Sequence, residues 1–220
     1  MTTKQTLPPY LFPLFIRLDG RPCLVVGGGK VAGRKIDGLL EAGAAVTVVS
    51  PEAIAQIQRL ASQGRVAWRQ KTFSTDDLHR SFLVMAATGD AAANGHIAAC
   101  CRAQGILMNV ADEPQLCDFF VPAVLRRGAL SIAIATEGKS PLLASKIKAD
   151  LEQIITKPYG EFLELLGLQR ELIKNTVPDS GTREAIFRSL VYSDILDLLA
   201  AGKQDEAQER IRQCISSQQD

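Results

Sequence analysis

Three consecutive glycines, Gly27, Gly28 and Gly29, stand between a β-rich run and a helical pattern. Together with the residues that follow, they match the spacing GxGxxA, a form of the dinucleotide-binding fingerprint. The first glycine of that motif permits a tight turn, and the second lets the backbone approach a pyrophosphate. Free N–H groups at the helix start then bind the anion. We predict that Gly27, Gly28, Gly29, Lys30 and Val31 bind a dinucleotide; a glycine turn without a ligand is the alternative.

The corner after the next β-rich run is the second place where such a cofactor would be held. It consists of Ser50, Pro51 and Glu52. An acidic residue at this corner hydrogen-bonds the ribose in NAD enzymes, whereas a nearby arginine accommodates the 2′-phosphate of NADP. Glu52 is the acidic candidate, and the sequence of the corner contains no arginine, so we predict NAD. Alternatively, Glu52 only complements the positive end of the next helix.

Asp112 follows the fifth β-rich run of the chain, at 106–110. The carboxyl ends of parallel strands face one crevice, so Asp112 would lie beside the nicotinamide end of a bound cofactor. A carboxylate in that position can act as a general base while a hydride is removed from a substrate. Asp112 is therefore a candidate general base, and a turn-capping aspartate is the alternative that the residues alone favour.

The run Thr136–Pro141 is the second place with the chemistry of an anion site. It combines a glycine, Lys139 and the start of a helix at Ser140. Helix N-termini and lysine side chains both attract anions. An ordinary strand-to-helix turn is the alternative. Arg126 and Arg127 stand at the tip of an expected hairpin, where they are either solvated side chains or part of the same basic surface.

The first half of the chain alternates β-rich runs with helical patterns, which is typical of βαβ units and a parallel sheet. We therefore predict an α/β fold, a Rossmann-type doubly wound sheet, over residues 1–113. Gly43 is expected to end the first helix, and Pro51 to open the second. The expected strands are 21–26, 45–49, 66–69, 82–86 and 106–110, and the expected helices are 31–42, one from residue 51, and 91–103.

The pattern changes after Asp112. Two strand-like runs, 119–125 and 129–135, indicate a β-hairpin, and Ser140 with Pro141 predicts the start of a helix that continues to about residue 155. The remainder reads as helical, with breaks at 178–181 and at Gly202. We therefore predict two further parts: a small hairpin-and-helix segment over 114–150, and a helical C-terminal domain over 151–220.

The composition of the 220 residues limits the classes of protein to consider. With 25 basic and 24 acidic residues the net charge is +1, which disfavours general nucleic-acid binding. No apolar stretch approaches the roughly 18 residues of a membrane span, and Met1–Pro9 does not resemble a signal peptide, so we expect a cytoplasmic protein. Five cysteines without a CxxC pair, and two histidines, predict no metal centre.

Several ordered motifs give the chain a resemblance to a known family. They are Leu24–Lys35, Ala86–Asp90 with Asn94, Asn109–Asp112, Cys117–Ala123 and Thr136–Pro141. Together they resemble the precorrin-2 dehydrogenase family, the amino-terminal module of siroheme synthase. The resemblance implies NAD-dependent oxidation of precorrin-2 to sirohydrochlorin and, in some members, insertion of Fe²⁺ at the same site. It also implies a homodimer built through the middle segment.

The resemblance assigns further residues. The family's catalytic aspartate falls on Asp112, and Thr88 falls in a cofactor-binding motif. The substrate of this family carries many carboxylates, so a nearly neutral protein needs local positive charge. Its candidate substrate-binding residues are Lys139, Ser140, Arg126 and Lys146. No residue separates dehydrogenase-only members from those that also act as ferrochelatases.

Two other functions remain open. A non-catalytic Rossmann module that senses NAD(H) would need the glycine turn but neither Asp112 nor the Lys139 loop. A protein that binds a tetrapyrrole for delivery, without oxidising it, is the third possibility.

Overall fold

A computed structural model describes residues 11–217 of the protein. The stretch Met1–Pro9, to which the expected lack of a signal peptide refers, lies outside the described residues. The chain divides into two compact units, Met1–Val121 and Pro122–Asp220, which are described one at a time. None of the described helices is both long and apolar enough to cross a membrane.

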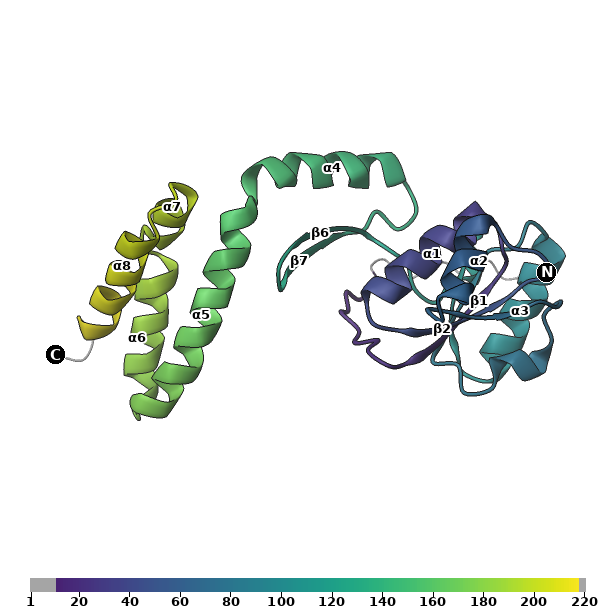
Figure 1. The fold of residues 1–220 in the computed structure, drawn as a ribbon, viewed down its shortest axis with the longest axis horizontal. Helices are drawn as coiled ribbons and strands as arrows, with labels where there is room; N and C mark the ends of the chain where they lie inside the picture. The colour runs from purple at the N-terminus through teal and green to yellow at the C-terminus, as the bar shows by residue number, and fades with distance from the viewer. Residues whose placement is uncertain (1–10, 218–220) are drawn as a thin grey trace, which may run out of the picture. The chain divides into compact units, whose positions relative to one another are not determined.

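The first unit contains a five-stranded parallel sheet with helices on both faces (Figure 1). The strand order is β3-β2-β1-β4-β5, so the chain starts at the centre, moves to one edge and then returns to build the other. This arrangement confirms the predicted Rossmann-type α/β fold. The strands are β1 (Pro22–Val26), β2 (Ala45–Val49), β3 (Ala67–Arg69), β4 (Leu83–Ala86) and β5 (Leu107–Val110). The helices are α1 (Lys30–Glu41), α2 (Ala55–Ser62) and α3 (Ala91–Ala103), with 3₁₀ turns η1 (Thr75–Leu78) and η2 (Pro114–Leu116).

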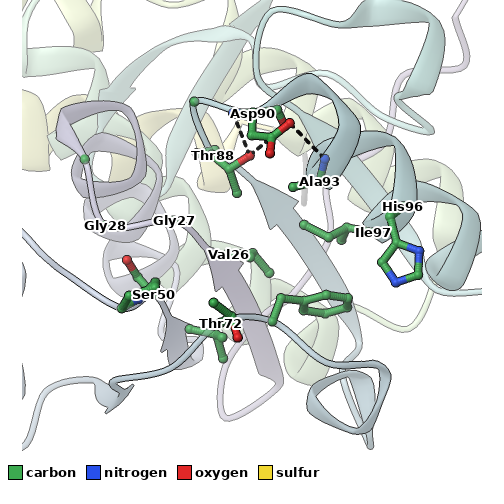
Figure 2. Close-up of a pocket in the computed structure, with 16 residues that line it drawn as sticks. Val26, Gly27, Gly28, Ser50, Thr72, Thr88, Asp90, Ala93, His96 and Ile97 are labelled. Atoms are coloured by element: carbon green, nitrogen blue, oxygen red, sulfur yellow. Dashed lines mark hydrogen bonds between the residues drawn. The ribbon is translucent and has the colours of Figure 1, made fainter.

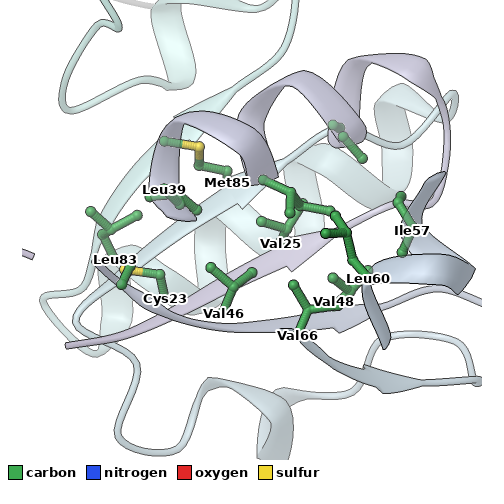
Figure 3. Close-up of a cluster of buried hydrophobic side chains, with 14 residues drawn as sticks. Cys23, Val25, Leu39, Val46, Val48, Ile57, Leu60, Val66, Leu83 and Met85 are labelled. Atoms are coloured by element: carbon green, nitrogen blue, oxygen red, sulfur yellow. The ribbon is translucent and has the colours of Figure 1, made fainter. Parts of the chain in front are cut away.

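Two apolar layers hold this sheet, one on each face. Cys23 and Val25 of β1 join the layer under α1 and α2 (Figure 3), whereas the alternating Leu24 and Val26 join the layer under α3. All four side chains are at most 3% exposed. Such a run, buried on both faces, is the pattern of a central parallel strand. The two layers therefore fix β1, and with it the direction in which the glycine turn leaves the sheet.

The end of α1 and the start of α2 test two predictions that were made from single residues, Gly43 and Pro51. Gly43 follows the last turn of α1 with φ 77°, as predicted. The prediction that Pro51 opens the second helix is wrong, because α2 begins at Ala55. The backbone N–H of Ile54 donates to the carbonyl of Gly28, 2.9 Å away. This contact with the glycine turn keeps the segment from Pro51 to Ile54 as a loop.

The second unit starts with an antiparallel hairpin and continues with helices. Its strands are β6 (Ala123–Arg127) and β7 (Leu130–Ile134), and its helices are α4 (Pro141–Ile154), α5 (Lys157–Thr176), α6 (Ser180–Val191), α7 (Ile195–Ala200) and α8 (Gln204–Ser216). Ser140 caps α4 as predicted, because its hydroxyl accepts from the backbone N–H of Leu143 at 3.2 Å. Buried side chains from α5 to α8 form a separate apolar core.

The hairpin differs from its prediction at the tip. Arg126 and Arg127 lie within β6, and the turn falls on Gly128, whose φ of 58° is the left-handed conformation that glycine tolerates. Arg127 is partly buried, and its Nε donates to the carbonyl of Ile155 at 2.8 Å. Arg127 thus joins the hairpin to the end of α4 and is not a solvated tip, while Arg126 is exposed.

Candidate active site

The glycine turn is shaped by two close approaches of backbone to backbone. Gly27 has φ 127°, and a Cβ on it would overlap the carbonyl of Ala87 at the end of β4. A Cβ on Gly28 would overlap the carbonyl of Glu52 and lie 2.9 Å from the Cα of Ala53. These two positions therefore accept no other residue without movement of the backbone.

Gly29 has a different environment from its two neighbours. It is the N-cap residue of α1, and no atom lies within 4 Å of a Cβ built on it. No side chain caps α1, so its first backbone N–H groups remain available for an anion. The open side of the turn thus matches the requirement of a pyrophosphate.

A cavity of about 510 Å³ lies over this turn (Figure 2). Its walls come from the glycine turn, the ends of β2 and β4, the loop after β3 and the first turns of α3. Six of the predicted cofactor residues line it: Gly27, Gly28, Gly29, Ser50, Pro51 and Thr88. Lys30, Val31 and Glu52, also predicted, are not among the lining residues. The volume lies within the usual range of small-molecule and cofactor pockets.

The start of α3 forms a second helix N-terminus at the cavity. Asp90 caps this helix, and its Oδ1 accepts from the backbone N–H groups of Ala92 at 2.8 Å and Ala93 at 3.2 Å (Figure 2). The hydroxyl of Thr88 donates to Oδ1 of Asn94 at 2.7 Å. The side chains of Thr88, Asp90 and Asn94 therefore fix the corner between β4 and α3 without a ligand.

Sequence reasoning missed the wall opposite the glycine turn. Phe73 and His96 meet there edge to face, with ring centroids 6.2 Å apart, and Ile97 lies beside them. Aromatic and apolar side chains of this kind suit the flat face of a nucleobase. The other lining residues that were not predicted are Val26, Val49, Thr72, Ala87, Gly89, Asp90 and Ala93. The loop after β3 and the helix α3 meet only in the folded chain, so no local motif points to this wall.

Asp77 is a buried carboxylate that holds two cations beside the cavity. Its side chain is 2% exposed, with Arg69 at 2.9 Å and Lys71 at 2.7 Å. It also accepts from the backbone N–H of Ser74 at 2.9 Å. Burial alone would raise the pKa of Asp77, but the hydrogen bonds from Lys71, the Ser74 backbone and Arg69 outweigh burial and lower the pKa to about 2.

This lowered pKa predicts a dependence of stability on pH. Asp77 contributes stability that is fully present above about pH 4, its ordinary pKa, and is lost as pH falls through about 2. We expect Asp77→Asn to cost on the order of 2 kcal/mol at neutral pH and to flatten the loss of stability between those two values. Urea unfolding at a series of pH values measures both effects. The exposed neighbour in Asp76→Asn is the control; equal slopes for wild type and Asp77→Asn would contradict the assignment.

Asp112 is the second residue after the end of β5, in a loop beside the cavity. The backbone N–H of Ala111 donates to the carbonyl of Ala86 at 2.9 Å, and the next two residues of that neighbouring strand end, Ala87 and Thr88, line the cavity. Asp112 itself is exposed, is not a lining residue, and has φ 62°. A positive φ is uncommon for an aspartate, and here it marks a tight turn of the backbone at Asp112.

Hydrogen bonds close the loop that carries Asp112, and we call this set the 110–117 clasp. The Cys117 thiol accepts from the backbone N–H of Val110 at 3.1 Å and donates to the carbonyl of the same residue at 3.3 Å. The backbone of Met108 bonds Asp118 in both directions, at 2.8 and 2.9 Å. Cys117 thereby connects the far end of the Asp112 loop to the end of β5.

A lysine from α1 completes this polar cluster. Lys35 donates from Nζ to Oδ1 of the buried Asn109 at 2.5 Å, and Nδ2 of that amide donates to the carbonyl of Phe119 at 2.9 Å. Burial lowers the pKa of Lys35, while the nearby Cys117 and Asp112 oppose that change. The start of the Asp112 loop is therefore held by contacts among Asn109 of β5, Lys35 of α1 and Phe119, which follows the loop.

The four candidate substrate residues lie in the second unit. Ser140 is the N-cap of α4, and Arg126 is exposed on β6. Lys139 bonds Glu137 at 3.0 Å and Lys146 bonds Asp150 at 2.6 Å, although both lysine side chains remain largely exposed. The structure thus brings the glycine turn, the β2 corner and Thr88 together at one cavity of the first unit, with the Asp112 loop beside it, whereas the four substrate candidates belong to the second unit.

Comparison with known proteins assigns three consecutive regions. Residues 14–123 match a family described as "Putative NAD(P)-binding". Residues 127–154 match the sirohaem biosynthesis protein central region, and residues 158–215 match the sirohaem synthase dimerisation region. Together the matches cover residues 14–215 except for two short gaps, at 124–126 and 155–157.

Individual relatives carry the same names. The siroheme synthase of Nitrosococcus oceani is 36% identical over 196 residues, which cover 89% of this chain and 42% of the relative. That of Methylococcus capsulatus is 37% identical over 196 residues, covering 89% and 41%. The chain thus spans about two fifths of these relatives. A solved structure titled "SirC, precorrin-2 dehydrogenase" has a TM-score of 0.75 and 31% identity, and the match covers 92% of this chain and 100% of that one.

Proposed function

Because the chain belongs to the precorrin-2 dehydrogenase and siroheme synthase family, we propose that it oxidises precorrin-2 to sirohydrochlorin with NAD as the oxidant. The observation that carries the proposal is the cavity at the glycine turn, beside the loop of Asp112. The expected family resemblance is confirmed. The match to the dehydrogenase structure over its whole length supports this activity more directly than the longer siroheme synthases do.

The residues at the cavity fit a bound dinucleotide. Gly29 leaves room for a close approach, and the uncapped start of α1 offers N–H donors to a pyrophosphate. We propose that the corner at Ser50 and Pro51 holds the ribose and that the wall of Phe73 and His96 holds the base, because all four residues line the cavity. When bound there, NAD would supply the hydride acceptor.

We propose that Asp112 is the general base of the oxidation. Converting precorrin-2 to sirohydrochlorin removes a hydride from a carbon of the substrate and a proton from a pyrrolic nitrogen. The hydride is taken up by the nicotinamide, and the proton needs an acceptor near the carboxyl end of β5. The exposed carboxylate of Asp112, held by the 110–117 clasp, provides one without first having to be ordered.

Insertion of Fe²⁺ stays a prediction for this chain. Metal insertion also removes protons from pyrrole nitrogens, so it would depend on a base in the same place. Fe²⁺ is then a substrate of the reaction. Among residues 11–217 there is no group of three metal-binding side chains, so the structure offers no resident metal centre there to describe.

Lys139, Ser140, Arg126 and Lys146 are proposed to bind the carboxylates of the tetrapyrrole. Lys139 is 80% and Lys146 is 68% exposed; Lys139 pairs with Glu137 in the loop before α4, and Lys146 pairs with Asp150 one helical turn later. Exposed ion pairs of this kind contribute little to stability, so a substrate carboxylate can replace the protein partner at small cost. The N-terminus of α4 at Ser140 adds backbone donors.

The proposed activity is tested by mixing the purified protein with precorrin-2 and NAD and following NADH and sirohydrochlorin absorbance. We expect both products to appear together and neither to appear when NAD is omitted. Binding of NAD without NADH formation would favour the NAD(H)-sensing module. Binding of the tetrapyrrole without oxidation would favour the delivery protein. A cytoplasmic location remains a prediction.

We also propose a homodimer. The region named for dimerisation matches α5 to α8, and α5 carries two exposed leucines one helical turn apart, Leu168 at 66% and Leu172 at 59%. The family resemblance implies a dimer through the middle segment 114–150, and there Val121, just before the hairpin, is 60% exposed. Large exposed apolar side chains in clusters mark interaction surfaces.

The dimer is measured by light scattering at micromolar concentration. We expect a mass of about twice 23.8 kDa. Comparing Leu168→Glu with Val121→Glu shows which surface forms the interface, because a buried charge at the right surface should dissociate the dimer. A wild-type mass equal to one chain would exclude the dimer.

A further inference from the structure

Two cations stand at the cofactor corner that the sequence shows without an arginine. β2 and β3 pair in parallel, and the backbone N–H of Ser50 donates to the carbonyl of Arg69 at 3.2 Å. Lys71 directly precedes Thr72 and Phe73, which line the cavity. In this fold the end of β2 receives the adenosine ribose, where NADP carries its 2′-phosphate. Both side chains therefore start next to the position that distinguishes the two cofactors.

The side chains of Arg69 and Lys71 are not simply solvated, because both form ion pairs with Asp77. Arg69 bonds one carboxylate oxygen at 2.9 Å and Lys71 the other at 2.7 Å. The cation side chains are 51% and 45% exposed, whereas that of Asp77 is 2% exposed. The carboxylate also accepts from the Ser74 backbone and hydroxyl, at 2.9 and 3.1 Å. The buried carboxylate of Asp77 therefore fixes the positions of Arg69 and Lys71.

We propose that Asp77 determines the preference for NAD over NADP by engaging Arg69 and Lys71. This inference rests on the proposed function, in which the cavity holds a dinucleotide. With the carboxylate present, the cluster of Arg69, Lys71 and Asp77 carries a net charge of +1, and Nη1 of Arg69 and Nζ of Lys71 both donate to the carboxylate. A 2′-phosphate would have to compete with a buried carboxylate for them, since charge-assisted bonds to either anion are of similar kind.

Removing the charge of Asp77 should leave Arg69 and Lys71 available to a 2′-phosphate. Asp77→Asn keeps the size of the side chain, raises the net charge of the cluster from +1 to +2 and leaves the guanidinium of Arg69 free to turn to the phosphate. Arginine in particular binds phosphate through paired N–H donors. NAD has no phosphate at this place and should be nearly indifferent to the change.

The experiment is calorimetric titration of NAD and of NADP into wild type and variants. We expect wild type to bind NAD at least tenfold more tightly, and Asp77→Asn to gain about tenfold in NADP affinity with little change for NAD, on the scale of one charge-assisted hydrogen bond. Ser74→Ala is the matched control, because it removes the hydroxyl bonds to Asp77 and Lys71 but keeps the carboxylate. It should leave the NAD-to-NADP ratio unchanged.

Two further variants keep the proposal testable if Asp77→Asn folds poorly. Arg69→Gln and Lys71→Gln, made in the wild-type background, should not lower NADP affinity, since the engaged cations contribute nothing to it. In a chain that also carries Asp77→Asn, the same changes should remove the gain.

Three outcomes would overturn the proposal. One is a folded Asp77→Asn protein with the wild-type ratio, and another is a loss of NADP affinity in either single glutamine variant. The third is tighter wild-type binding of NADP than of NAD. If wild type binds neither dinucleotide, the proposed function fails as well; if NAD binds and the ratio does not respond, this inference alone fails.

Discussion

Asp112→Asn is expected to lower dehydrogenase turnover by about 10²–10⁴, the usual contribution of a positioned general base, while NAD affinity stays nearly unchanged. Asparagine keeps the shape of the side chain and removes its basicity. It also tolerates the left-handed conformation, φ 62° at Asp112, that most residues avoid. The variant should therefore fold with the 110–117 clasp intact, so the loss reports on proton transfer.

The measurement is NADH and sirohydrochlorin formation in single turnovers, with NAD binding followed separately. Glu113→Gln is the matched control, since it removes a carboxylate from the adjacent position of the same loop. If the protein also inserts Fe²⁺, that activity should fall with Asp112→Asn. Near-normal sirohydrochlorin formation by a well-folded variant would show that the base lies elsewhere or that solvent suffices.

The second large effect is expected from Gly28→Ala. The added Cβ would overlap the Glu52 carbonyl and lie 2.5 Å from the Ser50 hydroxyl. The carbonyl is backbone, so the glycine turn and the β2 corner must move apart, at a cost of about 1–3 kcal/mol as for other overpacked sites. Because the cavity is built on these two segments, dinucleotide affinity should fall by at least about tenfold.

Two other glycines separate stability from binding in this test. Gly29→Ala meets no protein atom within 4 Å, so it should fold as wild type, yet its methyl group points to where the pyrophosphate must approach and should weaken binding. Gly38→Ala, on the exposed face of α1, should leave binding unchanged and raise helix stability slightly. Thermal unfolding and calorimetry measure the two effects. Wild-type affinity in both Gly28→Ala and Gly29→Ala would place the pyrophosphate elsewhere.

The parts of the fold that the sequence predicts are those specified by neighbours along the chain. The glycine turn, Gly43 at the end of α1 and Ser140 at the start of α4 each follow from a residue and its immediate context. The position of Asp112 follows from a rule about strand ends. All of these depend on a backbone conformation or a cap, which local residue types determine.

The parts that could not be predicted depend on contacts between distant segments. The start of α2 is delayed by a bond from Ile54 to Gly28, 26 positions earlier. Arg69 reaches the Ser50 corner through the register of two parallel strands, and Phe73 meets His96 across the cavity. Strand register and the contact between a loop and a helix are features of the tertiary structure, so no short sequence motif predicts them.

The clasp around Asp112 has a consequence for the chemical durability of the site. Cys117 performs its two bonds as a thiol, accepting from one backbone group and donating to another. Burial raises the pKa of Cys117, and oxidants attack the thiolate rather than the thiol. We therefore expect the sulfur that holds the Asp112 loop to react with peroxide more slowly than an exposed cysteine of ordinary pKa.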